Sequence, residues 1–352
     1  MNFLKLILFP LVPLYGIIIS IRNRLFDKNI FESKKVKATV ISVGNITVGG
    51  SGKTPIVMYL TKLLKNEGKK VAVLSRGYGR KSKGYYLVSD GINMLVSVDV
   101  CGDEIYHTAS EYNVAAAVSE NRVQGARNLI KQLNIDTILL DDAFQHRWIK
   151  RDLNLLIFEQ NFLCRNNFFV QNLLPTGIMR EPFNSVKRAD AIIINRKFSN
   201  HKKILNKNAR YLEGKTIFTS YYEAMEFIDV KKNIPYKLTE FKGQKSLVVS
   251  GIANPNSFIN ALKQIEIDTK NKLIFRDHKN YSFKDVEKIR AKFYSTNSHS
   301  VITTQKDAVK LCKFSKELDD IDIFYLKIEL RMDDIESFKN FILTNISSIR
   351  NN

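Results

Sequence analysis

The residues from 40 to 55 read VISVGNITVGGSGKTP, and this stretch constrains the fold more than any other part of the chain. Its β-branched apolar start predicts a buried strand, and the glycines that follow predict a tight turn. An amphipathic segment comes next, with Ile56, Leu60, Leu63 and Leu64 at helical spacing. A strand, a glycine-rich turn and a helix N-terminus together form the context of a P-loop, which binds nucleotide phosphates.

In a P-loop, the backbone N–H groups of the turn and the helix dipole bind phosphate oxygens. Lys53 would reach the β- and γ-phosphates, and the Thr54 hydroxyl would bind Mg²⁺. Thr47 departs from the eight-residue pattern, which has glycine at this position. The alternative is a glycine-rich hairpin with an incidental Lys-Thr pair, but the strand before and the helix after favour the P-loop. The predicted nucleotide-binding residues here are Thr47, Val48, Gly49, Gly50, Ser51, Gly52, Lys53 and Thr54.

The composition narrows the class of protein without choosing the partner. A chain of 352 residues with 44% hydrophobic residues fits one large or two ordinary globular domains. The net charge of +20 favours an anionic partner: nucleic acid, a phosphorylated metabolite or acidic lipid headgroups. A lysine-rich composition that serves only solubility is the alternative. Cys101, Cys164 and Cys312 form no disulfide or metal-binding pattern and fit a reducing, cytosolic setting.

The first 21 residues are strongly apolar, but one lysine and two prolines interrupt them and basic residues follow. A membrane-spanning helix needs about 20 clean apolar residues, so this run is borderline. An interfacial anchor, whose basic flank meets anionic headgroups, accounts for both features. A buried N-terminal helix is the alternative. No small-x-small cleavage site follows, which disfavours a signal peptide.

Further candidate residues follow the predicted strands. The strand at 69–74 ends in two arginines among glycines, the first of them Arg76, at the edge where α/β sheets bind ligands. A flexible basic turn is the alternative reading. Asp103 follows a glycine, a weak signal by itself, since such acids are commonly solvated or cap helices. The stretch DTILLDDAFQH from 136 to 146 delivers Asp141 and Asp142 at a strand end, as a Walker B acid is presented to a metal.

Two more charged sites come later in the chain. Arg180 and Glu181 lie in a loop between two predicted strands, where the arginine could meet a phosphate and the glutamate a metal or water. A surface salt bridge between them is the alternative. His278 is one of five histidines in the chain, and a histidine with no motif around it is more commonly structural than catalytic. The mixed, charged composition around 229–242 predicts a linker. Strands and helices continue to alternate after it, which predicts parallel sheets.

These segments together resemble the tetraacyldisaccharide 4'-kinase family, membrane-associated P-loop kinases of lipid A biosynthesis in Gram-negative bacteria. The family tolerates a non-glycine residue at position 47. Ala143 and Ile105 depart from the glycine and proline that are frequent in the family, and neither change removes a functional group. The matching stretches run in family order from residue 42 to 311: SVGNITVGGSGKTP, LSRGYGR, GDE, DDAFQH, LLPTGIMREP, GIANPNSF, DHKNY and TTQKDAVKL.

The resemblance implies a reaction. The γ-phosphate of ATP would pass to the 4'-hydroxyl of tetraacyldisaccharide 1-phosphate, giving lipid IVA. Asp103 would be the base near the sugar hydroxyl, with His278 paired to it, because an imidazole orients a carboxylate and tunes its basicity. Lys53, helped by Arg76 or Arg180, would neutralise the charge that develops during transfer.

The resemblance also implies the cofactors ATP and Mg²⁺. Thr54 and Asp142 would hold the metal with Asp141 and Glu181 nearby, and Arg122 would lie near the nucleotide or substrate. The expected partners are the acylated glucosamine disaccharide 1-phosphate lipid and the anionic cytoplasmic face of the inner membrane. The chain is expected to be a monomer and not to bind nucleic acid.

The expected fold is α/β. Residues 1–28 are expected to form an N-terminal membrane-associated helix, 29–228 a P-loop NTPase-like lobe with a parallel sheet, and 229–352 a smaller α/β lobe. The last helix of the smaller lobe could pack back on the first lobe. Two alternatives remain. A P-loop transferase or ligase for a soluble metabolite would leave the apolar N-terminus and the GDE and DHKNY motifs unexplained. A nucleotide-binding switch or nucleic-acid ATPase would need a recognition motif, which the sequence lacks.

Overall fold

The computed structural model describes residues 7–167, 170–252, 254–277 and 279–350. The chain divides into two compact units. The first contains residues 1–196, 201–220 and 332–352, and the second contains residues 197–200 and 221–331. The predicted division into 1–28, 29–228 and 229–352 stays a prediction.

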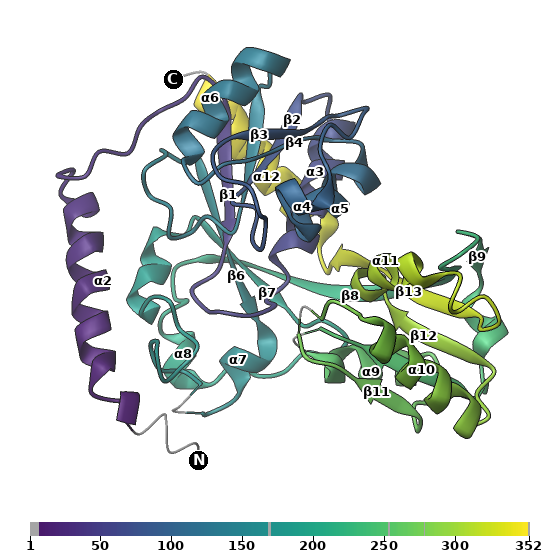
Figure 1. Cartoon of the computed structure of the whole chain (residues 1–352). Helices are drawn as coiled ribbons and strands as arrows, with labels where there is room; N and C mark the ends of the chain where they lie inside the picture. Colours follow the sequence, from purple (N-terminus) through teal and green to yellow (C-terminus); the bar gives the residue numbers. More distant parts are fainter. Residues whose placement is uncertain (1–6, 168–169, 253, 278, 351–352) are drawn as a thin grey trace. The chain divides into compact units, whose positions relative to one another are not determined.

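The first unit is built on a mostly parallel sheet. Only β3 is antiparallel to its neighbour, β4. Strands β1, β4, β5 and β7 are buried along their whole length, as expected for a parallel sheet that is covered on both faces. Across the sheet the strands are β3 (Tyr86–Asp90), β4 (Ala115–Val118), β2 (Val71–Ser75), β5 (Thr137–Asp141), β1 (Thr39–Gly44), β6 (Leu153–Glu159), β7 (Ala191–Asn195) and residues 216–220 of β8 (Thr216–Asp229) (Figure 1).

Helices cover the two faces of this sheet. On one face, α6 (Arg122–Leu133) contributes Val123, Ala126 and Leu129 to a buried cluster with residues of β1, β2, β4 and β5. On the other face lies α3 (Lys53–Asn66), whose buried residues include Ile56 and Leu60. Shorter helices of this unit are α4 (Val98–Cys101), α5 (Asp103–Tyr112), α7 (Gln160–Cys164), α8 (Asn206–Ala209) and a 3-10 helix at Phe183–Arg188.

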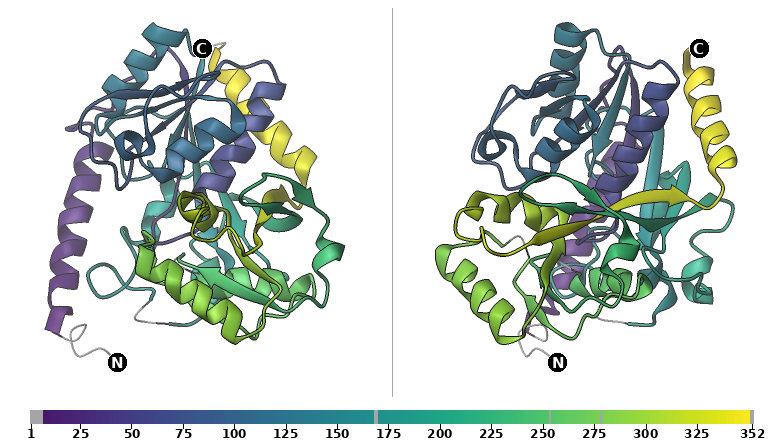
Figure 2. Two further views of the ribbon diagram at one scale, coloured as in Figure 1. Left: turned by 45° about the vertical axis from the view of Figure 1, so that its right-hand side comes forward. Right: turned by 90° about the vertical axis from the view of Figure 1, so that its right-hand side faces the viewer.

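The last helix, α12 (Ile335–Arg350), belongs to the first unit. Its Phe338 is fully buried and packs against Tyr59 of α3 and Phe218 of β8, with ring centroids 5.9 Å and 4.9 Å away. Lys339 also pairs with Glu67 at 2.7 Å. Figure 2 shows this helix in yellow beside the strands and helices of the first unit.

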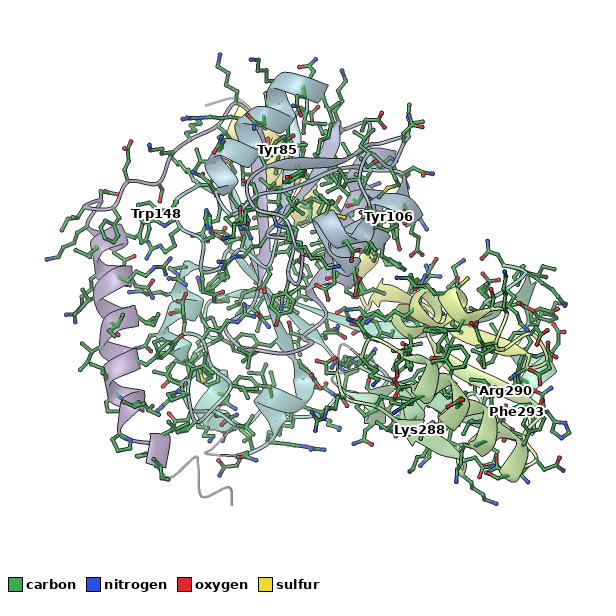
Figure 3. The ribbon with its side chains drawn as sticks, in the orientation of Figure 1. Tyr85, Tyr106, Trp148, Lys288, Arg290 and Phe293 are labelled. Carbon is green, nitrogen blue, oxygen red and sulfur yellow. The ribbon has the colours of Figure 1, made fainter. Side chains whose placement is uncertain are left out.

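The N-terminal helix α2 (Leu11–Asp27) is fixed at its C-terminal end by aromatic rings. Phe26 packs edge-on against both Phe31 and Trp148, with centroids 5.3 Å and 4.9 Å away. Trp148 is labelled near the C-terminal end of this helix in Figure 3. Leu14, Ile17, Ile18 and Ile21 on this helix are each more than half exposed. Within the described residues, no helix combines the length and the apolarity needed to cross a membrane.

In the second unit, β11, β10, β12 and β13 pair in parallel and carry a core on each face. In one core, residues of β10, β12 and β13 pack with α9; in the other, the opposite side chains of these strands pack with α10. Its strands are β11 (Lys272–Ile274), β10 (Ser246–Ser250), β12 (Ser300–Thr304), β13 (Ile323–Met332), residues 221–229 of β8, and β9 (Pro235–Tyr236) antiparallel to β8. Its helices are α9 (Pro255–Gln264), α10 (Phe283–Ser295), α11 (Gln305–Leu311) and 3-10 helices at Leu238–Phe241 and Cys312–Phe314. The predicted α/β class with a mostly parallel sheet is confirmed.

Candidate active site

The turn between β1 and α3 has room for an anion. Gly49 and Gly52 have φ angles of +100° and +95°, a region that glycine enters without strain. A Cβ atom at Gly49 or Gly50 would meet nothing within 4 Å, so space remains beside the turn. Lys53 and Thr54 begin α3, where backbone N–H groups have no partner within the helix. The turn therefore offers N–H donors and a helix N-terminus to a phosphate.

A buried asparagine that the sequence analysis did not single out holds this turn in shape. The side-chain amide of Asn45 donates to Ser51 Oγ at 2.8 Å and to Thr47 Oγ1 at 3.2 Å. The backbone N–H of Val48 donates to the carbonyl oxygen of Ile178 at 2.7 Å. Thr47 and Val48, both expected to bind the nucleotide, thus use these groups in contacts that shape the turn.

Two cations meet one carboxylate at the end of β5. Both Asp142 oxygens accept a hydrogen bond from Arg180 Nη1, each at 3.0 Å, and Lys53 Nζ lies 3.7 Å from Asp142 Oδ1. Asp142 has a φ angle of +49°, which is uncommon for a residue other than glycine. The structure therefore brings Lys53, Asp142 and Arg180 together. A phosphate that enters here would compete with the carboxylate for both cations.

A second group of charges surrounds Arg122 at the start of α6. The residue is 3% exposed and donates to the Ser119 and Glu120 carbonyls, while its Nε has no hydrogen-bond partner among the described residues. Burial and the nearby Arg76 charge lower the pKa of Arg122 to about 10, although Asp141 and Asp142 oppose this shift. Arg76, Arg122 and the two aspartates thus share one electrostatic environment.

His146 lies in the same environment. Burial, followed by the charge of Arg122, lowers the pKa of His146 to about 4, so the imidazole is neutral at pH 7. Its Nε2 is buried without a hydrogen-bond partner in the described part of the chain. The DDAFQH motif contained this histidine, but the spacing of the motif assigned it no role.

The segments that carry Arg76 and Asp103 pack backbone against backbone. A Cβ atom at Gly102 would lie 2.7 Å from the Tyr78 carbonyl oxygen, and one at Gly77 would lie 2.7 Å from the Cys101 carbonyl oxygen. Only glycine permits this approach. Asp103 is the first residue of α5 and is exposed, as is Arg76. The close contact places both side chains at the same edge of the sheet.

Glu181 does not join the other predicted metal ligands. It is fully buried, and its Oε2 accepts hydrogen bonds from Arg188 Nη2 at 2.5 Å and Asn23 Nδ2 at 3.1 Å. The physical reason is that Arg188 and Asn23 hold the Glu181 carboxylate, whereas the neighbouring Arg180 bonds to Asp142. We therefore leave Glu181 out of the proposed metal ligands.

Fewer residues remain for a metal. Among the described residues, no three histidine, cysteine, aspartate or glutamate side chains form a group that could hold one. Mg²⁺ at phosphate sites uses one or two carboxylates and takes its other ligands from phosphate and water. Asp141 is 6% exposed and pairs in register with Val43, just before the P-loop. Asp141 and the Thr54 hydroxyl therefore fit a nucleotide-bound Mg²⁺. His278 lies outside the described residues.

The fold and this arrangement of charges define a P-loop phosphotransferase. A family model described as tetraacyldisaccharide-1-P 4'-kinase matches residues 4–347 of the chain. The chain belongs to the tetraacyldisaccharide 4'-kinase family, and its activity is that of this ATP-dependent kinase of lipid A biosynthesis.

Relatives agree along the whole chain. The tetraacyldisaccharide 4'-kinase of Flavobacterium johnsoniae is 36% identical and covers 100% of this chain and 99% of its own length. The tetraacyldisaccharide 4'-kinase of Aquifex aeolicus is 34% identical, and the match covers 95% of this chain and 97% of that protein. The crystal structure of the "apo" form of LpxK from Aquifex aeolicus in complex with ATP superimposes with a TM-score of 0.78 at 33% identity, covering 97% of this chain and 99% of that one. The predicted family and activity are confirmed.

Proposed function

We propose that the chain transfers the γ-phosphate of ATP to the 4'-hydroxyl of tetraacyldisaccharide 1-phosphate, giving lipid IVA, through the residues described above. The observation that carries the mechanism is the approach of Lys53 and Arg180 to one carboxylate beside the P-loop. Phosphoryl transfer needs mainly positioning and charge stabilisation, because its transition state spreads negative charge over the phosphate oxygens. Two cations held at this point supply that stabilisation.

The nucleotide is held by groups on three segments. The N–H groups of Gly50, Gly52, Lys53 and Thr54 bind its phosphates, and Thr47 and Val48 keep the turn in shape. Arg76 and Arg122 add positive charge at the same edge of the sheet. The exposed Gly49 and the buried Ser51, whose hydroxyl accepts from Asn45, complete the turn.

Mg²⁺, when bound, neutralises part of the charge of the phosphates. Thr54, Asp141 and Asp142 are its proposed ligands. The two aspartates have different proposed roles because their surroundings differ. Asp141 is buried at the strand end, whereas Asp142 is paired with Arg180 and Lys53, so Asp142 both binds the metal and orients the two cations.

Asp103 is the proposed base. It is the first residue of α5 and is exposed, so its carboxylate is placed to accept the proton of the 4'-hydroxyl from a bound substrate. His278 is proposed as its partner, orienting the carboxylate through the imidazole. No other role is assigned to the DHKNY segment.

The lipid substrate is proposed to be taken from the cytoplasmic face of the inner membrane. Support comes from α2, whose exposed isoleucines form an apolar stripe, and from the net charge of +20. A groove of about 380 Å³ lies between this helix and residues 173–182, with Ile17, Ile21, Leu173 and Pro182 in its lining. Apolar walls of this kind fit an acyl chain.

A radiolabelled γ-phosphate transfer assay in detergent micelles tests the base and the lysine. Asp103→Ala is expected to lose about 10²-fold or more in kcat, because general base catalysis contributes that much. Lys53→Ala and His278→Ala are run beside it. The control is Asp99→Ala, an exposed aspartate that pairs with the exposed Lys81 at 3.3 Å, and it should keep wild-type activity. Full activity of Asp103→Ala would overturn the base assignment, and absence of lipid product with the wild-type chain would return the soluble-metabolite reading.

A further inference from the structure

The side chains of the segment 178–181 contact two different parts of the first unit. It is fixed on the P-loop by two backbone hydrogen bonds of 2.7 Å, from Val48 N–H to the Ile178 carbonyl and from Arg180 N–H to the Ile46 carbonyl. Arg180 Nη1 bonds to Asp142, whereas the next side chain, Glu181, bonds to Arg188 and Asn23. A change in the position of the 180–181 peptide would therefore move both side chains.

Three side chains close a ring behind this segment. Asn23 donates to Glu181 Oε2 at 3.1 Å and accepts from Arg188 Nη1 at 3.0 Å, while Arg188 Nη2 donates to the same Glu181 oxygen at 2.5 Å. Glu181 is fully buried and Arg188 also lies over the Phe144 ring. Burying such an ion pair costs desolvation that apolar packing would avoid, so it adds geometric definition more than stability.

The N-terminal helix α2 also contacts the 180–181 peptide directly. The Tyr15 hydroxyl donates to the Arg180 carbonyl oxygen at 3.0 Å. Burial and the Glu181 charge raise the pKa of Tyr15, so the hydroxyl keeps its proton. Tyr15 and Asn23 thus hold the residue that contacts Asp142 and the residue after it. The apolar side chains of α2 point to solvent from the same helix.

We propose that Asn23 and Tyr15 of α2 are positioning residues for Arg180: through Glu181, Arg188 and the 180–181 peptide they set how the guanidinium meets the phosphate being transferred. The inference rests on the proposed role of Arg180. It makes α2 part of the catalytic apparatus in addition to a membrane contact. The helix that contacts lipid through its exposed apolar side chains then also positions Arg180 for phosphate transfer, through Tyr15 and Asn23.

A double-mutant cycle on the full-length chain tests this proposal. Asn23→Ala is expected to lower kcat about tenfold, the effect of one hydrogen bond to a charged group, and to change the KM for ATP by less than about twofold. Arg180→Ala should lose more. In the Arg180→Ala background, Asn23→Ala should cause no further loss, because residues that act through one another are not additive.

Matched variants separate positioning from loss of structure. Tyr15→Phe removes one hydroxyl and keeps the ring, and a fall in kcat of about threefold is expected. Asp27→Asn weakens another contact of the same helix, its 2.8 Å ion pair with Arg147, and should leave kcat unchanged. Multiplied losses in the double variant, or an equal loss in Asp27→Asn, would overturn the proposal. Wild-type kcat in Arg180→Ala would instead remove the role of Arg180 on which it rests.

Discussion

At the scale of single residues, the site concentrates its strain and its charge on Asp142. A left-handed backbone costs a residue other than glycine about 1 kcal/mol or more, and aspartate tolerates it better than most because its side chain bonds locally. The surrounding contacts offset this cost, since the carboxylate meets both Arg180 and Lys53. The geometry places the carboxylate within reach of both cations.

Replacing this carboxylate by its amide should therefore affect activity far more than folding. Asp142→Asn keeps a side chain that tolerates the left-handed backbone but leaves the cations without their counter-charge. We expect kcat to fall at least about tenfold. The free energy of unfolding should change by less than about 1 kcal/mol, because the side chain is 36% exposed. Steady-state kinetics measure the change in kcat, and urea unfolding measures the change in the free energy of unfolding. A wild-type kcat in Asp142→Asn would contradict the proposed role of this carboxylate.

The sequence predicted several of these residues but not how they pair. Lys53, Asp142 and Arg180 were each chosen from a local motif, yet Arg180 and Asp142 are 38 residues apart, and only the packing of 178–181 on the P-loop joins them. The same packing turns Glu181 away from the nucleotide. Asn45 lay inside the most informative stretch, but its role depends on two hydroxyls that the folded turn brings to its amide.

At the scale of elements, two loops meet because glycines allow their backbones to touch. Gly102 has a φ angle of +93° and lies against the Tyr78 carbonyl, which fixes the start of α5 and with it Asp103. Motif spacing indicated that a glycine follows Arg76 and that another precedes Asp103. It did not indicate that each glycine lies against the other loop, because that contact joins segments from two different strands.

A methyl group at Gly102 should therefore displace the base. Gly102→Ala meets a backbone oxygen at 2.7 Å and a disfavoured φ angle together, so a loss of about 2–3 kcal/mol in unfolding free energy and a lower kcat are expected. Gly84→Ala is the matched control, because its φ angle is +86° but a Cβ atom there would meet nothing within 4 Å. It should lose only about 1 kcal/mol and keep its kcat. Equal effects of the two substitutions would refute the close-approach argument.

At the scale of the whole molecule, apolar periodicity predicted a mostly parallel α/β chain correctly, because buried parallel strands read as continuous β-branched runs. The N-terminal run was harder to interpret, since its composition fits both a buried helix and a membrane contact. The structure separates these two faces on one helix. Val12 and Phe26 are buried, whereas the stripe at Leu14, Ile17 and Ile18 is exposed. Exposed apolar surface of this kind marks an interaction site.

If that stripe contacts the bilayer, charging it should release the chain from membranes and leave the P-loop intact. We expect the triple change Leu14→Glu, Ile17→Glu and Ile18→Glu to lower binding to phosphatidylglycerol-containing vesicles roughly 100-fold, because it removes apolar burial and adds repulsion from anionic headgroups. Co-sedimentation measures this, and ATP binding by the same variant checks that the P-loop is intact.

The control is Ile92→Glu, since Ile92 is 85% exposed on a different part of the first unit and should not affect vesicle binding. High salt distinguishes the two contributions to binding, because screening weakens the attraction of basic side chains but not apolar insertion. A wild-type chain that dissociates fully at high salt would be bound by charge alone. Such a result would leave the stripe without a membrane role, whereas residual binding that the triple variant lacks would assign the apolar contribution to α2.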